Sequence, residues 1–216
     1  LSKPESHHCI KVLRKSISDE IMVVDGVGNL YFTKLIGLNP KKVILEITNI
    51  QKDYSKRENY IHIAISPTKS MDRLEWFLEK VVEIGIDEIT LIQCMNSERT
   101  KIKMERCDKI IMSAMKQSLK AYLPKLNPLV KFNEFISHSH SAQAKSIGFL
   151  GIEKSTFITD YHKNKKSHLI CIGPEGDFSD SEIQIALANG FRCISLGNSR
   201  LRTETAGVAV ATLINL

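Results

Sequence analysis

A change of residue pattern near position 60 constrains the fold of this chain more than any other feature of its sequence. From there to the C-terminus, short apolar segments alternate with amphipathic ones. The pattern predicts strands over residues 60–65, 88–93, 147–151, 169–172 and 193–196, and helices over 70–84 and 104–122, from 179 and from 203. Strands that alternate with helices form a mostly parallel sheet, which binds ligands beyond the C-terminal ends of its strands. We therefore expect an α/β domain whose site lies in the loops after Ile172 and Leu196.

The preceding segment has a β pattern. Between residues 21 and 50, apolar stretches are interrupted by turns rich in glycine and asparagine, which supply the positive φ that hairpins need. This predicts consecutive antiparallel strands in a small barrel or meander. Residues 51–59 carry no periodic apolar signal, so we place a domain boundary there. The prediction is a β domain over residues 1–58 and an α/β domain over residues 59–216.

Composition excludes several classes of protein. The chain has 216 residues, of which 43% are hydrophobic and 25% charged, as in ordinary globular proteins. Its longest apolar runs, such as residues 206–216, are shorter than the roughly 18 to 20 residues that cross a bilayer. It opens without a signal-peptide pattern, so we expect a cytoplasmic protein with no membrane partner. The five cysteines are scattered, and neither they nor His7 and His8 predict a metal site.

Most of the net charge lies in one segment. Residues 97–125 hold eight basic and three acidic side chains, a net charge of +5 within a chain of +6. At about 100° per residue, the predicted helix places Lys109, Lys116 and Lys120 together, opposite its apolar residues. Such a stripe is either a solvated helix face or a contact for a nucleic-acid phosphate backbone, and both interpretations stay open at this point.

The first of two glycine loops runs from residue 170 to 179, with the sequence Ile-Cys-Ile-Gly-Pro-Glu-Gly-Asp-Phe-Ser. It leads from a buried strand into a helix capped by Ser179 or Asp180. Its glycines allow backbone groups to approach a ligand, and Pro174 stiffens it. The loop lacks the fingerprints of dinucleotide and P-loop sites, which argues against NAD and ATP. An ordinary strand-to-helix turn is the alternative.

The second loop, residues 195–206, has the sequence Ser-Leu-Gly-Asn-Ser-Arg-Leu-Arg-Thr-Glu-Thr-Ala. Its threonines and glutamate can cap the final helix, and Arg200 or Arg202 can pair with Glu204. This structural explanation accounts for the acid and the hydroxyls better than for two arginines beside a glycine turn. We therefore expect the arginines to have a functional role.

Together the two loops, Gly173-Pro-Glu-Gly-Asp-Phe-Ser with Glu182 and Leu196-Gly-Asn-Ser-Arg-Leu-Arg-Thr-Glu-Thr-Ala206, closely resemble the RsmE family of 16S ribosomal RNA uridine-N3 methyltransferases, members of the SPOUT class. The resemblance extends along the chain, through Ser6–Arg14, Asp25–Asn29, Lys69–Arg73, Val81–Gly85, Ser97–Arg99 and Ala114–Pro124. Asp177 stands where the family usually has a second glycine. Because aspartate tolerates left-handed geometry better than most residues, we expect the loop to keep its shape. Ser199 replaces an arginine common in the family, with Arg200 one place later.

The resemblance implies an α/β SPOUT domain with a C-terminal trefoil knot, preceded by a small PUA-like β-barrel for RNA binding. The chain begins about where the first strand of that barrel would already have ended. The resemblance also implies a homodimer that uses S-adenosylmethionine to methylate the N3 of a specific uridine in 16S ribosomal RNA of the small subunit. The residues that would bind the cofactor are Gly151, Ile172, Gly173, Pro174, Glu175, Gly176, Leu196, Gly197, Leu201, Arg202 and Thr203.

The implied reaction requires loss of the uridine N3 proton and stabilisation of the resulting anion. Arginine suits the second task because it stays protonated, so we expect Arg202 to be catalytic, with Arg200 as second candidate. Glu204 and Glu175 are the candidates for the base. The residues expected to bind RNA are Arg14, Lys69, Arg73, Arg99, Lys109, Lys116 and Lys120. The alternatives are a SPOUT methyltransferase with another RNA target and a non-catalytic RNA-binding module; the absent dinucleotide fingerprint disfavours a nicotinamide oxidoreductase.

Overall fold

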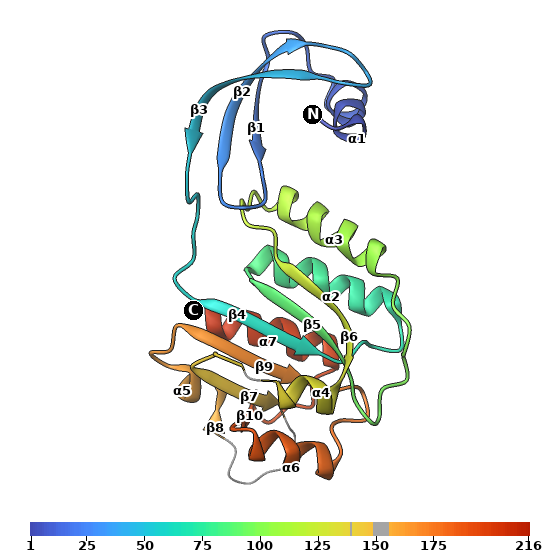
Figure 1. The fold of residues 1–216 in the computed structure, drawn as a ribbon, viewed down its shortest axis with the longest axis vertical. Coiled ribbons are helices and arrows are strands. Elements are labelled where there is room, and N and C mark those ends of the chain that lie inside the picture. Colours follow the sequence, from blue (N-terminus) through green and yellow to red (C-terminus); the bar gives the residue numbers. More distant parts are fainter. Residues whose placement is uncertain (139, 149–155) are drawn as a thin grey trace. The chain divides into compact units, whose positions relative to one another are not determined.

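The computed structural model describes residues 1–138, 140–148 and 156–216, which form two compact units (Figure 1). The first unit comprises residues 1–56 and 119–122. The second comprises residues 57–118 and 123–216. Within the described residues, no helix combines the length and the apolar character of a membrane span.

The first unit is built on a three-stranded antiparallel sheet in the order β1-β2-β3. Its elements are α1 (Lys3–His7), the π-helix η1 (His8–Val12), β1 (Glu20–Val24), β2 (Leu30–Gly37) and β3 (Ile44–Gln51). A small core forms around Cys9, Leu35 and Val43. The prediction of consecutive antiparallel strands is confirmed, although the described residues form an open sheet of three strands.

The second unit contains a seven-stranded sheet in the order β6-β5-β4-β9-β7-β10-β8, with every described pairing parallel. Its strands are β4 (Tyr60–Ile65), β5 (Glu88–Gln93), β6 (Lys125–Lys131), β7 (Ala144–Gly148), β8 (Thr156–Phe157), β9 (Ser167–Ile172) and β10 (Arg192–Ser195). The central strands β4 and β9 are buried almost throughout, as expected for a sheet covered on both faces. The predicted parallel α/β sheet is therefore confirmed.

Helices cover both faces of this sheet. They are α2 (Met71–Ile84), α3 (Met104–Gln117), α4 (Phe132–Ser137), α5 (Ile158–His162), α6 (Asp180–Ala188) and α7 (Thr203–Asn215). On one face, α7 packs against β4, β9 and α2, and Gly207 lets it approach Phe77 and Ile65. On the other face, α4 and α6 pack over Ala64 and Cys171. Side chains alternate between the faces of a strand, which is why Ala64 and Ile65 face different helices.

The predicted helix over residues 104–122 ends earlier, at Gln117. Leu119 adopts a left-handed conformation with φ of 54°, and the segment that follows belongs to the first unit. There the Tyr122 hydroxyl donates to Asp53 Oδ1 at 2.8 Å. This contact joins residues far apart in sequence. Helical periodicity depends only on neighbouring residues, so it could not show that the helix ends before Tyr122. Lys120 therefore does not lie on α3, and the predicted stripe of three lysines is wrong at that position.

Several short elements were not predicted, namely α1, η1, β6, α4, β8 and α5. Apart from β6, each is six residues or shorter, too short for a period to be visible. In β6, Pro128 and an irregular register interrupt the strand pattern. The strand predicted over residues 147–151 begins earlier, at Ala144, and its last three residues lie outside the described part of the chain.

Candidate active site

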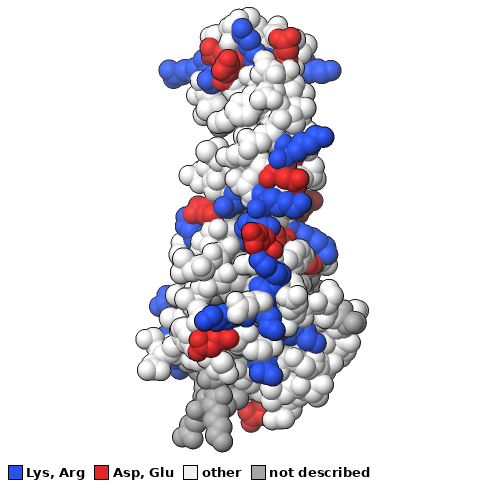
Figure 2. Space-filling view, turned by 90° about the vertical axis from the view of Figure 1, so that its left-hand side faces the viewer, with Lys and Arg blue, Asp and Glu red and all other residues white. Residues whose placement is uncertain are grey.

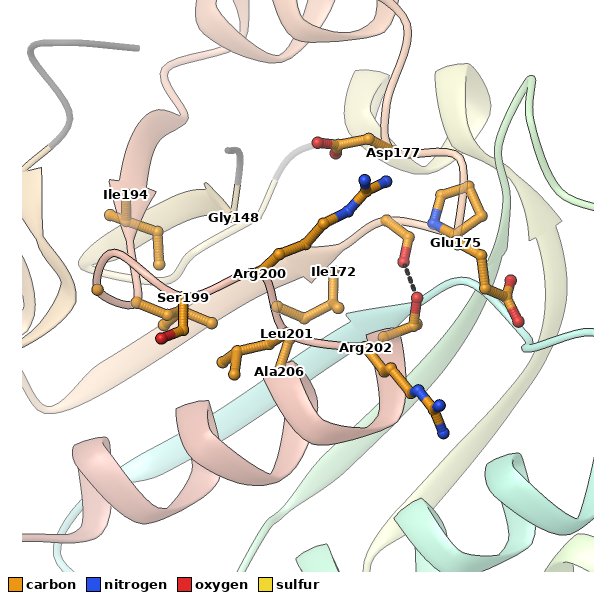
Figure 3. Close-up of a pocket in the computed structure, with 15 residues that line it drawn as sticks. Gly148, Ile172, Glu175, Asp177, Ile194, Ser199, Arg200, Leu201, Arg202 and Ala206 are labelled. Carbon is orange, nitrogen blue, oxygen red and sulfur yellow. Dashed lines mark hydrogen bonds between the residues drawn. The ribbon is translucent and has the colours of Figure 1, made fainter. Parts of the chain in front are cut away.

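A cavity of about 260 Å³ lies at the C-terminal ends of β7, β9 and β10, where the predicted glycine loops meet (Figure 3). The predicted cofactor residues that line it are Ile172, Gly173, Pro174, Glu175, Leu196, Gly197, Leu201, Arg202 and Thr203. Gly176 does not line the cavity. Gly151 lies outside the described residues. The structure thus brings together both loops that the sequence singled out.

Five other residues that line the cavity were not predicted: Gly148, Asp177, Ile194, Ser199 and Ala206. Ile194 and Ala206 lie in a strand and a helix and follow the same apolar pattern as core residues. Gly148 is the last residue of β7. From the sequence, ligands were expected beyond the C-terminal ends of the strands, but the end of this strand was not singled out. Asp177 and Ser199 stand inside the glycine loops and could have been included on that ground.

The first loop is a closed turn. The Asp177 N–H donates to the Pro174 carbonyl at 2.9 Å, and the Asp177 carboxylate accepts the Phe178 N–H at 2.8 Å. Asp177 adopts left-handed geometry, with φ of 62°, as the expectation that the loop keeps its shape requires. Ser179 caps α6 in a capping box with Glu182, which accepts the Ser179 N–H at 2.9 Å.

The second loop is shaped by Gly197, whose φ of 112° is unfavourable for other residues. A Cβ placed there would meet no atom of the described residues within 4 Å, so within that part of the chain its backbone borders open space. The next helix begins at Thr203, but Arg202 is its N-cap and makes no capping hydrogen bond. Thr203 instead donates from Oγ1 to the Gly173 carbonyl at 2.9 Å (Figure 3). The suggested capping role of Thr203 is therefore wrong, and this hydroxyl joins the two loops.

The two candidate arginines both line the cavity and are exposed. Figure 3 shows their side chains leaving the loop in different directions, with Arg200 extending toward Asp177 and Arg202 away from it. In the described part of the chain, neither forms an ion pair with Glu204. That carboxylate is only 6% exposed, and its Oε1 lies 3.8 Å from Arg73 Nε of α2. Its Oε2 has no hydrogen-bond partner among the described residues.

Glu175 connects the cavity to the loop after β4. One of its carboxylate oxygens accepts the main-chain N–H of Lys69 at 3.0 Å. Arg99 donates from Nε to the Thr68 carbonyl at 3.1 Å and also bonds the Lys69 carbonyl. The Lys69 ammonium, which is largely exposed, lies 2.8 Å from Glu98. The guanidinium of Arg99 thus forms hydrogen bonds with the main chain of this loop. Its charge alone had suggested RNA binding.

The remaining RNA-binding candidates divide between the two units. Arg14 and Lys120 belong to the first unit, whereas Lys109 and Lys116 are exposed on α3 of the second. The neighbouring Arg106 pairs with Glu75 of α2 through two contacts, at 2.5 and 2.7 Å. Among the described residues on the face drawn in Figure 2, basic and acidic side chains are interspersed. No group of three or more metal-ligating side chains is present in the described part of the chain.

Comparisons with known proteins match both units. A family model described as an RNA methyltransferase domain matches residues 55–215, and one described as an RNA methyltransferase PUA domain matches residues 1–48. A ribosomal RNA small subunit methyltransferase E from Mesomycoplasma hyopneumoniae strain 232 is 30% identical over 94% of this chain and 88% of its own. The chain belongs to the ribosomal RNA small subunit methyltransferase E family.

Solved structures of similar proteins have the same fold. A probable rRNA methyltransferase from Porphyromonas gingivalis is 37% identical, with a TM-score of 0.91 over 99% of this chain and 91% of that one. A small subunit methyltransferase E from Neisseria gonorrhoeae, solved bound to S-adenosyl methionine, is 26% identical, with a TM-score of 0.87 over 98% of this chain and 88% of that one. The predicted family, the α/β fold with a parallel sheet, the PUA-like N-terminal domain and the assignment as a methyltransferase are confirmed.

Proposed function

We propose that this protein methylates the N3 of a specific uridine in 16S ribosomal RNA of the small subunit, with S-adenosylmethionine bound in the cavity between the two glycine loops. The observation that carries the assignment of the site is the hydrogen bond from Thr203 to Gly173, which holds the loops together around that cavity. Family membership supports the reaction, and the predicted cofactor residues support the location.

The residues around the cavity fit this cofactor. Ile172, Ile194 and Leu201 provide apolar walls for an adenine ring, and the backbone at Gly173 and Gly197 provides hydrogen-bonding groups. Because a Cβ at Gly197 would meet no described atom within 4 Å, a ligand can approach the main chain there without meeting a side chain of the described residues. When bound, the cofactor supplies an electrophilic methyl group.

The arginines at the cavity are suited to the substrate. Deprotonation of N3 places negative charge on O2 and O4 of the uracil ring, and a guanidinium stabilises that charge through hydrogen bonds. We assign this role to Arg202, with Arg200 as the second candidate. Two carboxylates are the candidates to accept the N3 proton or to orient an arginine or a loop. Glu175 lines the cavity, whereas the buried Glu204 beside Arg73 is not among the described residues that line it.

The RNA is proposed to contact Arg14 in the PUA-like unit and Lys109 and Lys116 on α3, with Lys69 and Arg73 nearer the cavity. Their charges would hold the phosphate backbone while the target base is turned out of the folded RNA. The protein would act in the cytoplasm, as a homodimer. Within the described residues, the structure offers no observation that favours another RNA target or a purely RNA-binding module.

Calorimetric titration of S-adenosylmethionine, with NADH and ATP as controls, tests the cofactor. Transfer of a tritiated methyl group to undermethylated small subunits, followed by mapping of the product, tests the substrate. Binding of S-adenosylmethionine with modification of one uridine at N3 is expected. Methylation of tRNA, or of another ribosomal position, would assign a different substrate. A folded protein that binds no S-adenosylmethionine would contradict the proposal.

A further inference from the structure

The loop that follows β5 holds the first glycine loop from outside the cavity. The carboxamide nitrogen of Asn96 donates to the carbonyls of Gly176 and Asp177, each at 3.1 Å. Asn96 itself does not line the cavity, whereas Asp177 does. The side chain of Asn96 is therefore bonded to the outer side of a segment whose inner side forms the cavity wall.

Gly176 is explained by the same contact. A Cβ at this position would lie 3.1 Å from the Asn96 Cβ and 3.6 Å from its Cγ. Gly176 is not among the glycines with positive φ, so its backbone conformation does not require glycine. The family resemblance implied that Gly176 lines or shapes the cofactor pocket. The structure indicates instead that glycine at 176 allows Asn96 to come close.

The loop that presents Asn96 is itself anchored. The Met95 N–H donates to Oε1 of the buried Glu182 at 2.8 Å. On the other side, the Ser97 hydroxyl accepts the Cys94 N–H at 2.8 Å and bonds Ser66 at 2.8 Å. Asn96 is thus held at both flanks, which lowers the entropy lost when its side chain bonds the glycine loop.

The bonds from Asn96 complete the hydrogen bonding of two consecutive peptide groups. In the first, the Asp177 N–H bonds Pro174 and the Gly176 carbonyl bonds Asn96. In the second, the Phe178 N–H bonds the Asp177 carboxylate and the Asp177 carbonyl bonds Asn96. Asp177 has φ of 62°, a conformation that costs a residue other than glycine conformational energy. The bonds from Asn96 offset that cost.

We propose that Asn96 is a positioning residue for the cofactor: it holds Asp177 in its left-handed conformation and so maintains the wall of the cavity. This inference rests on the proposed function, in which the cavity binds S-adenosylmethionine. It assigns a functional role to a side chain outside both glycine loops and outside the cavity.

The first test compares Asn96→Ala with Asn133→Ala, a matched change of an exposed asparagine on α4. Loss of two hydrogen bonds is expected to weaken S-adenosylmethionine binding about tenfold in calorimetry, with no change in the control. The KM for the cofactor should rise in proportion, while kcat at saturating cofactor and the KM for RNA stay the same. A merely structural role would lower the yield of folded protein and leave the affinity of the folded fraction unchanged. That result would overturn the proposal.

The second test is a double-mutant cycle between the two positions. Gly176→Ala should weaken cofactor binding in the wild-type background, because its Cβ meets Asn96. It should cause little further loss in an Asn96→Gly background, where that side chain is absent. Additive losses would show that Gly176 and Asn96 act independently, contrary to the proposal.

Amide hydrogen exchange of residues 175–178 in the free protein separates this inference from the proposed function. Exchange is expected to be faster in Asn96→Ala than in the wild type and in Asn133→Ala. If the wild type binds no S-adenosylmethionine, the proposed cofactor is refuted. Faster exchange in Asn96→Ala would in that case still support the role of Asn96 in ordering the loop. Unchanged exchange would overturn the inference, whatever the cavity binds.

Discussion

The hydroxyl of Thr203 donates a hydrogen bond of 2.9 Å to the carbonyl of Gly173, across 30 positions of sequence. Thr203 is the first residue of α7, and Gly173 directly follows β9. Both residues are buried and both line the cavity. The bond therefore connects the start of the last helix to the loop that we propose binds the cofactor.

Thr203→Val should lower both stability and cofactor affinity, because valine keeps the shape of the side chain but leaves the Gly173 carbonyl without this partner. We expect unfolding to become easier by about 1–2 kcal/mol in urea titrations and S-adenosylmethionine to bind several-fold more weakly. Thr205→Val, an exposed position in the same helical turn, is the control. Equal effects of the two changes would contradict a specific role for the Thr203 bond.

Arg202→Ala should retain most cofactor binding and lose methyl transfer, because its guanidinium is proposed to act on the uracil ring. A loss of about a hundredfold or more in kcat is expected for a group that stabilises developing charge. Arg200→Ala, measured in parallel, decides which arginine has that role. The exposed Arg192 of β10 provides the control. Equal loss of cofactor binding in the Arg202 and Gly173 variants would refute this division of roles.

Gly173→Val should abolish cofactor binding. A Cβ at Gly173 would already lie 3.0 Å from the Phe178 ring, and valine adds two further carbons beside it. The loop must then move away from the position in which its backbone borders the cavity. Calorimetry with S-adenosylmethionine and circular dichroism on the same sample test this expectation. A folded Gly173→Val protein with wild-type affinity would place the cofactor elsewhere.

Changing Lys109 and Lys116 together to alanine should weaken RNA binding and reduce its dependence on salt. Each lysine that neutralises a phosphate contributes about 0.7 to 0.9 to the slope of log K against log salt, so the slope should fall by about 1.5. The exposed pair Lys163 and Lys165 supplies a control with the same change in net charge. An unchanged slope would identify the α3 lysines as a solvated face.

Stability should fall when the pH is lowered from 7 to 5. Burial lowers the pKa of His62 to about 4, and burial together with the neighbouring His168 lowers that of His162 to about 4. An unfolded histidine takes up its proton near pH 6.5, so unfolding binds protons throughout this range. The stability that each histidine contributes is fully present above pH 6.5 and is lost as the pH falls toward 4. At pH 5, each histidine has lowered the free energy of unfolding by about 1–2 kcal/mol.

Urea unfolding at pH 7 and at pH 5 measures this loss. His162→Gln should lower stability at pH 7 but make it less dependent on pH. Substitution of His7, which is exposed near the N-terminus, should leave the dependence unchanged. A pH dependence that persists in full after His62 and His162 are both replaced would assign it to other groups.

Local features of the sequence were sufficient to predict a parallel α/β sheet, five of its seven described strands and the loops that line the cavity. Apolar periodicity reports whether a segment is a strand or a helix, and the alternation of the two implies a parallel sheet. Loops after Ile172 and Leu196 were expected to meet because β9 and β10 end at the same edge of that sheet. The arginines at 200 and 202 were identified because they exceed what a helix cap requires.

Tertiary structure alone decided which side chains act together. It decided that α3 ends at Gln117. It also decided three contacts between distant segments of the chain: Arg73 with Glu204, Thr203 with Gly173, and Asn96 with Gly176. Asn96 lies 80 positions from Gly176 and belongs to no periodic pattern. Periodicity and motifs report on a residue and its near neighbours, whereas these hydrogen bonds and ion pairs depend on the order in which the strands join the sheet. That order is set by the packing of the whole unit.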